Sequence, residues 1–116
     1  MVELWHNPGC SKSRAAKAIL DERGVAYDER RYLDDAPTAA ELDQVLTALA
    51  LEPWQLARLG EPVAAELGLL TWPHDDRGRW IDAMVAHPVL IERPILVADD
   101  GRARLGRPPE AFEILL

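Results

Sequence analysis

The first third of the chain is predicted to form a strand, a helix and a second strand, and this order restricts the fold more than any other feature. Residues 2–5 are a short, mostly apolar run, and a helical pattern follows over residues 11–23. The side chains expected on the inner side of that helix are Ala15, Ala18, Ile19 and Leu20. Gly24 is the expected helix end, and residues 25–33 suit a strand near a sheet edge. A strand–helix–strand unit predicts a right-handed crossover and a parallel pair of strands.

The middle of the chain is predicted to be mostly helical. Thr38 and Glu41 have the spacing of a capping box, and apolar residues follow them at helical intervals. Shorter helical segments are expected over residues 53–59 and 62–67, the second ended by Gly68. A further amphipathic helix is marked by Trp80, Ala83, Met84 and His87. These segments form an insertion between two sheet-forming ends.

The last third returns to strands. Residues 94–97 are a compact apolar strand, residues 99–101 a turn, and residues 102–105 alternate polar with apolar side chains, which indicates a hairpin. Residues 108–115 are predicted to form a final helix with Phe112 and Leu115, because proline is tolerated in a first turn. We therefore predict an α/β fold: a thioredoxin-like four-stranded mixed sheet with a helical insertion between strands 2 and 3, as one domain over residues 1–116.

Composition excludes several classes of partner. The 116 residues carry a formal charge of −7, which disfavours non-specific binding to nucleic acid or to anionic membranes. No apolar stretch is long enough to span a bilayer, and the N-terminal residues lack a signal-peptide pattern. The single cysteine allows no internal disulfide, and a reduced thiol fits the cytosol. A cytoplasmic protein that binds no nucleic acid or membrane is expected.

The single cysteine, Cys10, stands where the first strand gives way to the helix, and it is the candidate nucleophile. A helix start directs unpaired N–H groups and partial positive charge at that position, with Lys12, Arg14 and His6 close in sequence. Such surroundings favour the thiolate form and an oxyanion substrate. The predicted oxyanion-binding loop is Ser11, Lys12, Ser13 and Arg14. The alternative is a buried structural cysteine, but its polar neighbours favour an exposed thiol.

Two other kinds of site are disfavoured by spacing. A phosphatase loop of the Cys-five residues-Arg type would need arginine six positions after Cys10, where Ala16 stands. One cysteine and three scattered histidines offer no zinc-ligand spacing, so no metal is expected. Ser13 occupies the position of the second cysteine in a two-cysteine redox motif, so the site cannot close a disulfide of its own.

Three segments together resemble the signature segments of the ArsC family, the glutaredoxin-coupled arsenate reductases. They are His6-Asn7-Pro8-Gly9-Cys10 with Ser13-Arg14, Glu92-Arg93-Pro94-Ile95 and Gly106-Arg107-Pro108-Pro109-Glu110. The similarity extends over essentially the whole chain, in order and at matching spacing. The Cys-Ser-Lys-Ser-Arg version of the first segment is similar to a sister group within that family.

The resemblance implies a set of roles. Cys10 would be the nucleophile that takes arsenate, and Arg58, Arg93 and Arg107 would bind the oxyanion. His6 would tune the thiol, although a hydrogen-bonded structural histidine is an equal alternative. The Arg93–Pro94 bond would be cis, as in other thioredoxin-like folds. No bound cofactor is implied; glutathione would be the co-substrate and glutaredoxin the protein partner.

Two further functions stay open from the sequence. One is a transcriptional regulator that resembles Spx, has the same fold and binds RNA polymerase; such proteins generally use a Cys-x-x-Cys switch, which Ser13 interrupts. The other is a glutathione-dependent thiol-transfer protein that uses the same cysteine without arsenate.

Overall fold

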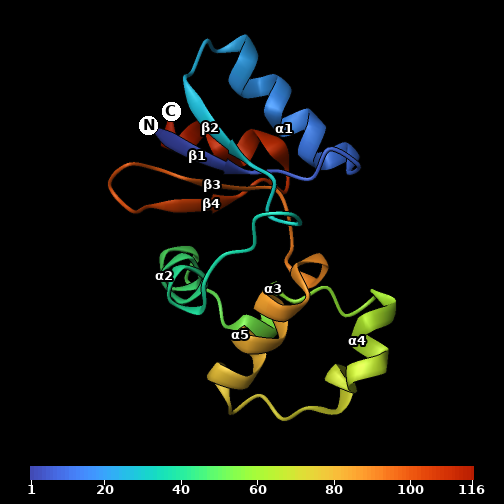
Figure 1. Ribbon diagram of the computed structural model, residues 1–116. Coiled ribbons are helices and arrows are strands. Elements are labelled where there is room, and N and C mark those ends of the chain that lie inside the picture. Colours follow the sequence, from blue (N-terminus) through green and yellow to red (C-terminus); the bar gives the residue numbers. More distant parts are fainter. The chain divides into compact units, whose positions relative to one another are not determined.

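The sheet has four strands in the order β2-β1-β3-β4, as Figure 1 shows for this computed structural model of residues Met1–Leu116. The strands are β1 Val2–Trp5, β2 Tyr27–Arg30, β3 Ile95–Val97 and β4 Ala103–Leu105. β1 pairs in parallel with β2 and antiparallel with β3, and β3 pairs antiparallel with β4. The mixed four-stranded sheet is therefore confirmed. β2 is an outer strand of the sheet, as expected. It ends at Arg30, because the chain then turns and the Arg31 carbonyl accepts hydrogen bonds from the backbone N–H groups of Asp34 and Asp35.

One face of the sheet carries the core of this part of the chain. Leu4 and Leu96 are paired across β1 and β3, and both are completely buried. They pack in one cluster with Ala16 and Leu20 of α1 (Ser11–Glu22) and with Phe112 near the C-terminus. Removing such side chains from water stabilises the unit by about 25 cal/mol per Å² of buried apolar area.

The buried side of α1 differs from the prediction. Ser13, Ala16 and Leu20 are buried, whereas Ala15 and Ala18 are exposed. The buried positions follow the three-and-four spacing of a helix face, but that face begins with a serine. The prediction is therefore confirmed for Leu20, nearly so for the half-buried Ile19, and wrong for the two alanines. Gly24, at φ 66°, is confirmed as the residue that ends the helix.

The last helical segment is a 3-10 helix, η3 Pro109–Leu115, which contacts both α1 and β4. Its Phe112 is fully buried. Just before it, Gly106 is closely packed, because a Cβ atom built there would lie 2.7 Å from Cγ of Pro94 and 2.9 Å from Cζ of Phe112. Only a residue without a side chain fits between them.

The insertion between β2 and β3 is helical, as predicted. It contains α2 Ala39–Leu49, α3 Pro53–Leu56, α4 Pro62–Leu67, η1 Leu69–Thr71, α5 Arg77–Ala86 and η2 Pro88–Leu90. The capping box is confirmed: the Thr38 hydroxyl accepts from the Glu41 N–H at 3.1 Å, and the Thr38 N–H donates to Oε1 of Glu41 at 3.0 Å. α3 ends before residue 59, because Ala57 forms an isolated bridge with Ile91.

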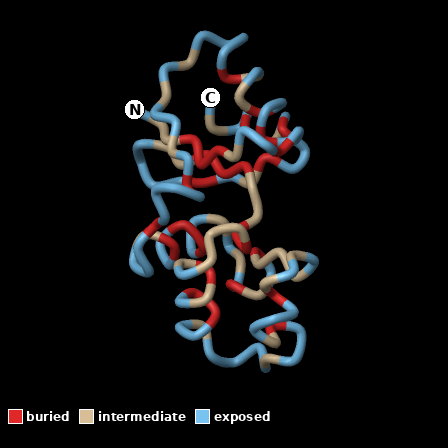
Figure 2. Tube along the Cα trace, turned by 45° about the vertical axis from the view of Figure 1, so that its right-hand side comes forward, coloured by how far each residue is buried: buried red, intermediate tan, exposed pale blue.

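The chain divides into two compact units. The sheet unit comprises Met1–Asp35 and Arg93–Leu116, and the helical unit comprises Ala36–Glu92. Figure 2 shows buried residues along the strands of the first unit and along the helices of the second. The prediction of one domain over residues 1–116 stays a prediction. No helix of either unit combines the length and the apolar character that a membrane crossing needs.

Candidate active site at one edge of the sheet

Three segments that carry predicted site residues meet at one edge of the sheet. Trp5, the last residue of β1, pairs with Ile95 at the start of β3, and Ile95 pairs with Leu105 at the end of β4. The chain after β1, the chain before β3 and the chain after β4 therefore leave the sheet at the same edge. These segments carry Cys10, Arg93 and Arg107, respectively.

Cys10 is the N-cap residue of α1. Its backbone is extended, with φ −103° and ψ 125°, and its N–H donates to the Asn7 carbonyl at 3.0 Å. The residue is only 9% exposed, so the expectation of an exposed thiol is wrong. Cys10 is nevertheless not a member of the packed cluster of this unit. Its neighbours Gly9 and Ser11 are both exposed.

The first turn of α1 keeps the character expected of an anion site. The side chain of Cys10 accepts no capping hydrogen bond, and the first turn contains no acidic residue. The first N–H groups of a helix have no partner inside it, and they carry the positive end of the helix dipole. Ser11 and Lys12 are both exposed there. This end of α1 can therefore accept an anion next to the Cys10 sulfur.

Three side chains hold the loop that precedes Cys10. Oδ1 of Asn7 accepts from the Gly9 N–H at 2.9 Å, and Oγ of Ser13 accepts from the Asn7 N–H at 3.0 Å. Nη1 of Arg14 donates to the Pro8 carbonyl at 2.8 Å. Asn7 was not singled out from the sequence, although an asparagine that begins an Asn-Pro-Gly run is a recognisable turn signal. The loop is therefore held by hydrogen bonds from these side chains to its backbone groups.

His6 and Ser13 form a buried pair beneath that loop. Nδ1 of His6 lies 2.7 Å from Oγ of Ser13, and the two residues are 3% and 0% exposed. Burial lowers the pKa of His6 below its ordinary value, although the charge of Glu29 partly opposes this shift. The Ser13 hydroxyl is thus engaged with His6 and Asn7 rather than directed to solvent. Its part in binding an oxyanion stays a prediction, for which only its backbone N–H is left.

Arg93 and Arg107 are joined directly. Nε of Arg107 donates to the Arg93 carbonyl at 2.8 Å, and the Gly106 N–H donates to the Pro94 carbonyl at 2.8 Å. The Arg93–Pro94 bond is cis, as the family resemblance implied, and the Arg107–Pro108 bond is also cis, which was not expected. The two arginines, far apart in sequence, therefore occupy neighbouring positions at the site edge.

Arg58 belongs to the helical unit. Its Nη1 lies 2.6 Å from Oε1 of Glu61 and its Nε 3.5 Å from Oε1 of Glu92. Its backbone N–H donates to the Leu90 carbonyl at 2.7 Å. Two carboxylates thus balance this guanidinium, and its contact with a bound oxyanion stays a prediction. No group of three or more metal-ligating side chains is found in the protein.

Comparisons with known proteins find similarity over nearly the whole chain. The family model described as "ArsC family" matches residues 5–115. A protein of Streptomyces viridochromogenes named for its place in the glnII region is 50% identical over 112 residues, which cover 95% of this chain and 94% of that relative. The arsenate reductase of Neisseria meningitidis is 40% identical, with coverage of 99% and 97%. The structure of the arsenate reductase from Vibrio cholerae matches with a TM-score of 0.89 at 40% identity, and covers 99% and 97% of the two chains.

Proposed function

The chain belongs to the ArsC family, and on that premise we propose that it is an arsenate reductase that uses Cys10 as nucleophile and glutathione with glutaredoxin as reductants. The observation that carries this proposal is the meeting of three segments at one sheet edge. One brings a thiol at an uncapped helix start, and the other two bring Arg93 and Arg107. Relatives with the name arsenate reductase, 40% identical over nearly the whole chain, support the same substrate.

The first step is attack by the Cys10 thiolate on arsenate. The sulfur–arsenic bond forms, and one arsenate oxygen leaves as water after protonation. Two negative species must approach each other, so positive groups have to offset the repulsion. The N–H groups at the start of α1 and the guanidinium groups of Arg93 and Arg107 do this, because a guanidinium binds oxyanions through two parallel N–H donors and stays charged.

Two electrons from two thiols then reduce the arsenic. Glutathione thiolate attacks the Cys10 sulfur, the sulfur–arsenic bond breaks, and arsenite leaves with the electron pair. This leaves a mixed disulfide between Cys10 and glutathione. A glutaredoxin thiolate attacks the glutathione sulfur and releases the Cys10 thiolate. The protein has no second cysteine, so an external thiol must complete the cycle.

The test is an NADPH-coupled assay with arsenate, glutathione, glutaredoxin and glutathione reductase. We expect turnover by the native protein and none by Cys10→Ser. Arg93→Lys and Arg107→Lys should each lower kcat/KM about a hundredfold, because each keeps the charge but loses the two-pronged contact with the developing anion. Arg104→Lys is the matched control, since Arg104 is an exposed arginine of β4 and should retain full activity.

The same assay separates the alternatives. A thiol-transfer protein would form and exchange the glutathione adduct of Cys10 at the same rate with and without arsenate. A regulator that resembles Spx would show no arsenate-dependent NADPH oxidation. Full turnover by the two lysine variants would contradict the proposed anion site.

A further inference from the structure

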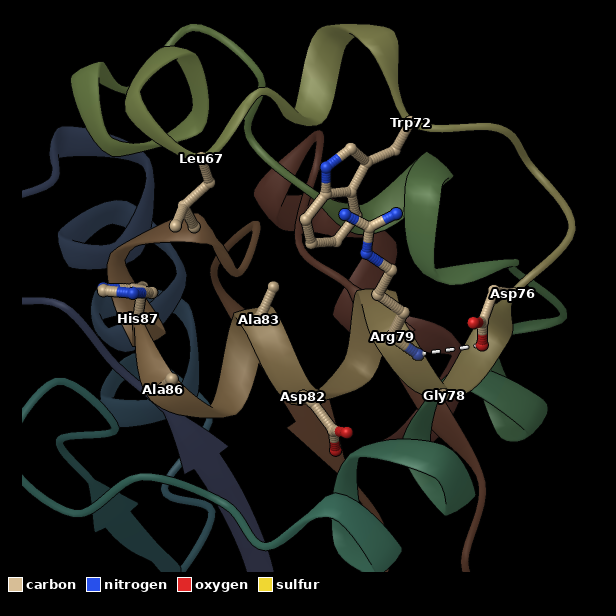
Figure 3. Close-up of a pocket in the computed structure, with 9 residues that line it drawn as sticks. All are labelled: Leu67, Trp72, Asp76, Gly78, Arg79, Asp82, Ala83, Ala86 and His87. Carbon is tan, nitrogen blue, oxygen red and sulfur yellow. Dashed lines mark hydrogen bonds between the residues drawn. The ribbon is translucent and has the colours of Figure 1, made fainter.

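A pocket in the helical unit is not accounted for by the proposed chemistry at Cys10. Its volume is about 600 Å³, within the usual range of small-molecule sites. The pocket lies between the end of α4 and α5, and Figure 3 shows Leu67 and His87 at one end and Trp72 and Arg79 at the other. Ala83 points into the space between them. Every lining residue belongs to the helical unit, so the pocket is complete within that unit.

The walls of the pocket are mostly apolar and leave room for a ligand. Ala83 and Ala86 are small residues along α5, and the side chain of Leu67 closes the far end. Trp72 presents a large flat surface, and its indole is held edge-on by buried Trp80, with ring centroids 5.5 Å apart at 81°. A flat, apolar molecular body fits such walls, because aromatic surfaces pack well against an indole.

Arg79 gives the pocket a positive group that forms no salt bridge with a carboxylate. Its Cζ lies 3.7 Å from the Trp72 ring centroid, so the guanidinium is stacked on the indole. The helical unit contains no lysine and only two other arginines, and both are paired with acids: Arg58 with Glu61 and Glu92, and Arg77 with Asp43 and Glu52. Stacking occupies the flat face of the Arg79 guanidinium and leaves its N–H edge available to an anion.

Two aspartates, Asp76 and Asp82, also line the pocket, but neither carboxylate faces its apolar space. Oδ1 of Asp76 accepts a hydrogen bond from the backbone N–H of Arg79 at 3.1 Å and so caps the start of α5. The positive end of the helix dipole offsets the charge of the Asp76 carboxylate there. The Asp82 carboxylate points away from Trp72 in Figure 3. Arg79 is thus the charged group that faces the apolar space.

We propose that this pocket binds a small organic anion: a carboxylate on a flat apolar body, with the carboxylate on Arg79 and the body between Trp72 and Leu67. The inference is independent of the proposed reductase function, because it concerns a different unit and needs neither Cys10 nor arsenate.

The test compares three probes with one body and different charge: 1-naphthylacetate, its neutral amide 1-naphthylacetamide, and the 1-naphthylmethylammonium cation. Binding to the full-length protein is measured by calorimetry, without arsenate or glutathione. We expect the anion to bind about fivefold more tightly than the amide, and the cation to bind most weakly. Arg79→Gln should remove the preference for the anion over the amide and leave binding of the amide nearly unchanged.

Filling the pocket gives a second measurement. Ala83→Leu should abolish binding of all three probes, and Ala86→Leu, at an exposed position, does the same with less risk to folding. Arg104→Gln in the sheet unit is the control and should leave all three affinities unchanged. The proposal would be overturned if the cation bound most tightly, if all three probes bound equally, or if none bound. It would also be overturned if the folded leucine variants bound the probes as well as the native protein.

Discussion

Gly106 offers the sharpest test of how the site edge is packed. In Gly106→Ala the new methyl group would lie 2.7 Å from Cγ of Pro94 and 2.9–3.0 Å from two ring atoms of Phe112. These distances are shorter than any van der Waals contact between carbon atoms, so at least one neighbour must move. Phe112 is completely buried and Pro94 is also buried, so neither can move freely aside. Overpacking of this kind costs about 2 kcal/mol.

The loss should appear in thermal unfolding followed by circular dichroism. For a chain of this size, about 2 kcal/mol corresponds to a Tm lower by about 8 °C. Two other glycines serve as controls. Gly60→Ala meets no atom within 4 Å and should change the Tm by less than about 3 °C. Gly24→Ala also has space, but its φ of 66° should cost about 1 kcal/mol through the backbone alone.

A double-mutant cycle isolates the contact itself. Phe112→Leu removes the two ring atoms that the methyl group would meet, so Gly106→Ala should destabilise that background less than it destabilises the native protein. The remaining cost reflects Pro94. A Tm of Gly106→Ala equal to that of Gly60→Ala, or strictly additive effects with Phe112→Leu, would refute the packing argument.

Three further predictions follow from individual contacts. Thr38→Ala removes one half of the capping box and should lower the free energy of unfolding, measured by urea titration, by about 1 kcal/mol. An unchanged urea midpoint would show that the cap does not stabilise the protein. The pKa of His6 is lowered in the folded state, so the unfolded chain binds more protons as the pH falls. The native protein should therefore be fully stabilised by this group above about pH 6.5 and lose stability below it, more steeply than His6→Asn in urea titrations at successive pH values. Arg14→Met should free the Pro8 carbonyl and speed alkylation of the buried Cys10 by iodoacetamide, because the loop before Cys10 loses one of its restraints and opens more often. A slower or equal rate would assign Arg14 to another role.

The strands, the helix ends and the candidate nucleophile could be predicted from the sequence, because each depends on residues close together in the chain. A threonine three residues before a glutamate caps a helix wherever it occurs, and a glycine in the left-handed conformation ends one. Local patterns likewise predicted the strands and the C-terminal hairpin, whereas the pairing of β1 with β3 is known only from the structure. Cys10 stood out because a lone thiol at a strand-to-helix junction needs only local reasoning.

The contacts of buried polar groups, which join different elements of the fold, could not be predicted from the sequence. Ser13 is polar, yet it lies on the buried side of α1 because His6 and the Asn7 N–H satisfy its hydroxyl there. The burial of Cys10 and the bond from Arg107 to the Arg93 carbonyl likewise depend on the folded loop and on a hairpin. A local pattern states which conformation a segment prefers, but the partner of a buried polar group is known only after the chain has brought that partner to it. The sequence therefore determined the elements and the nucleophile of this protein, and the tertiary structure determined how the nucleophile is covered and which arginines stand beside each other.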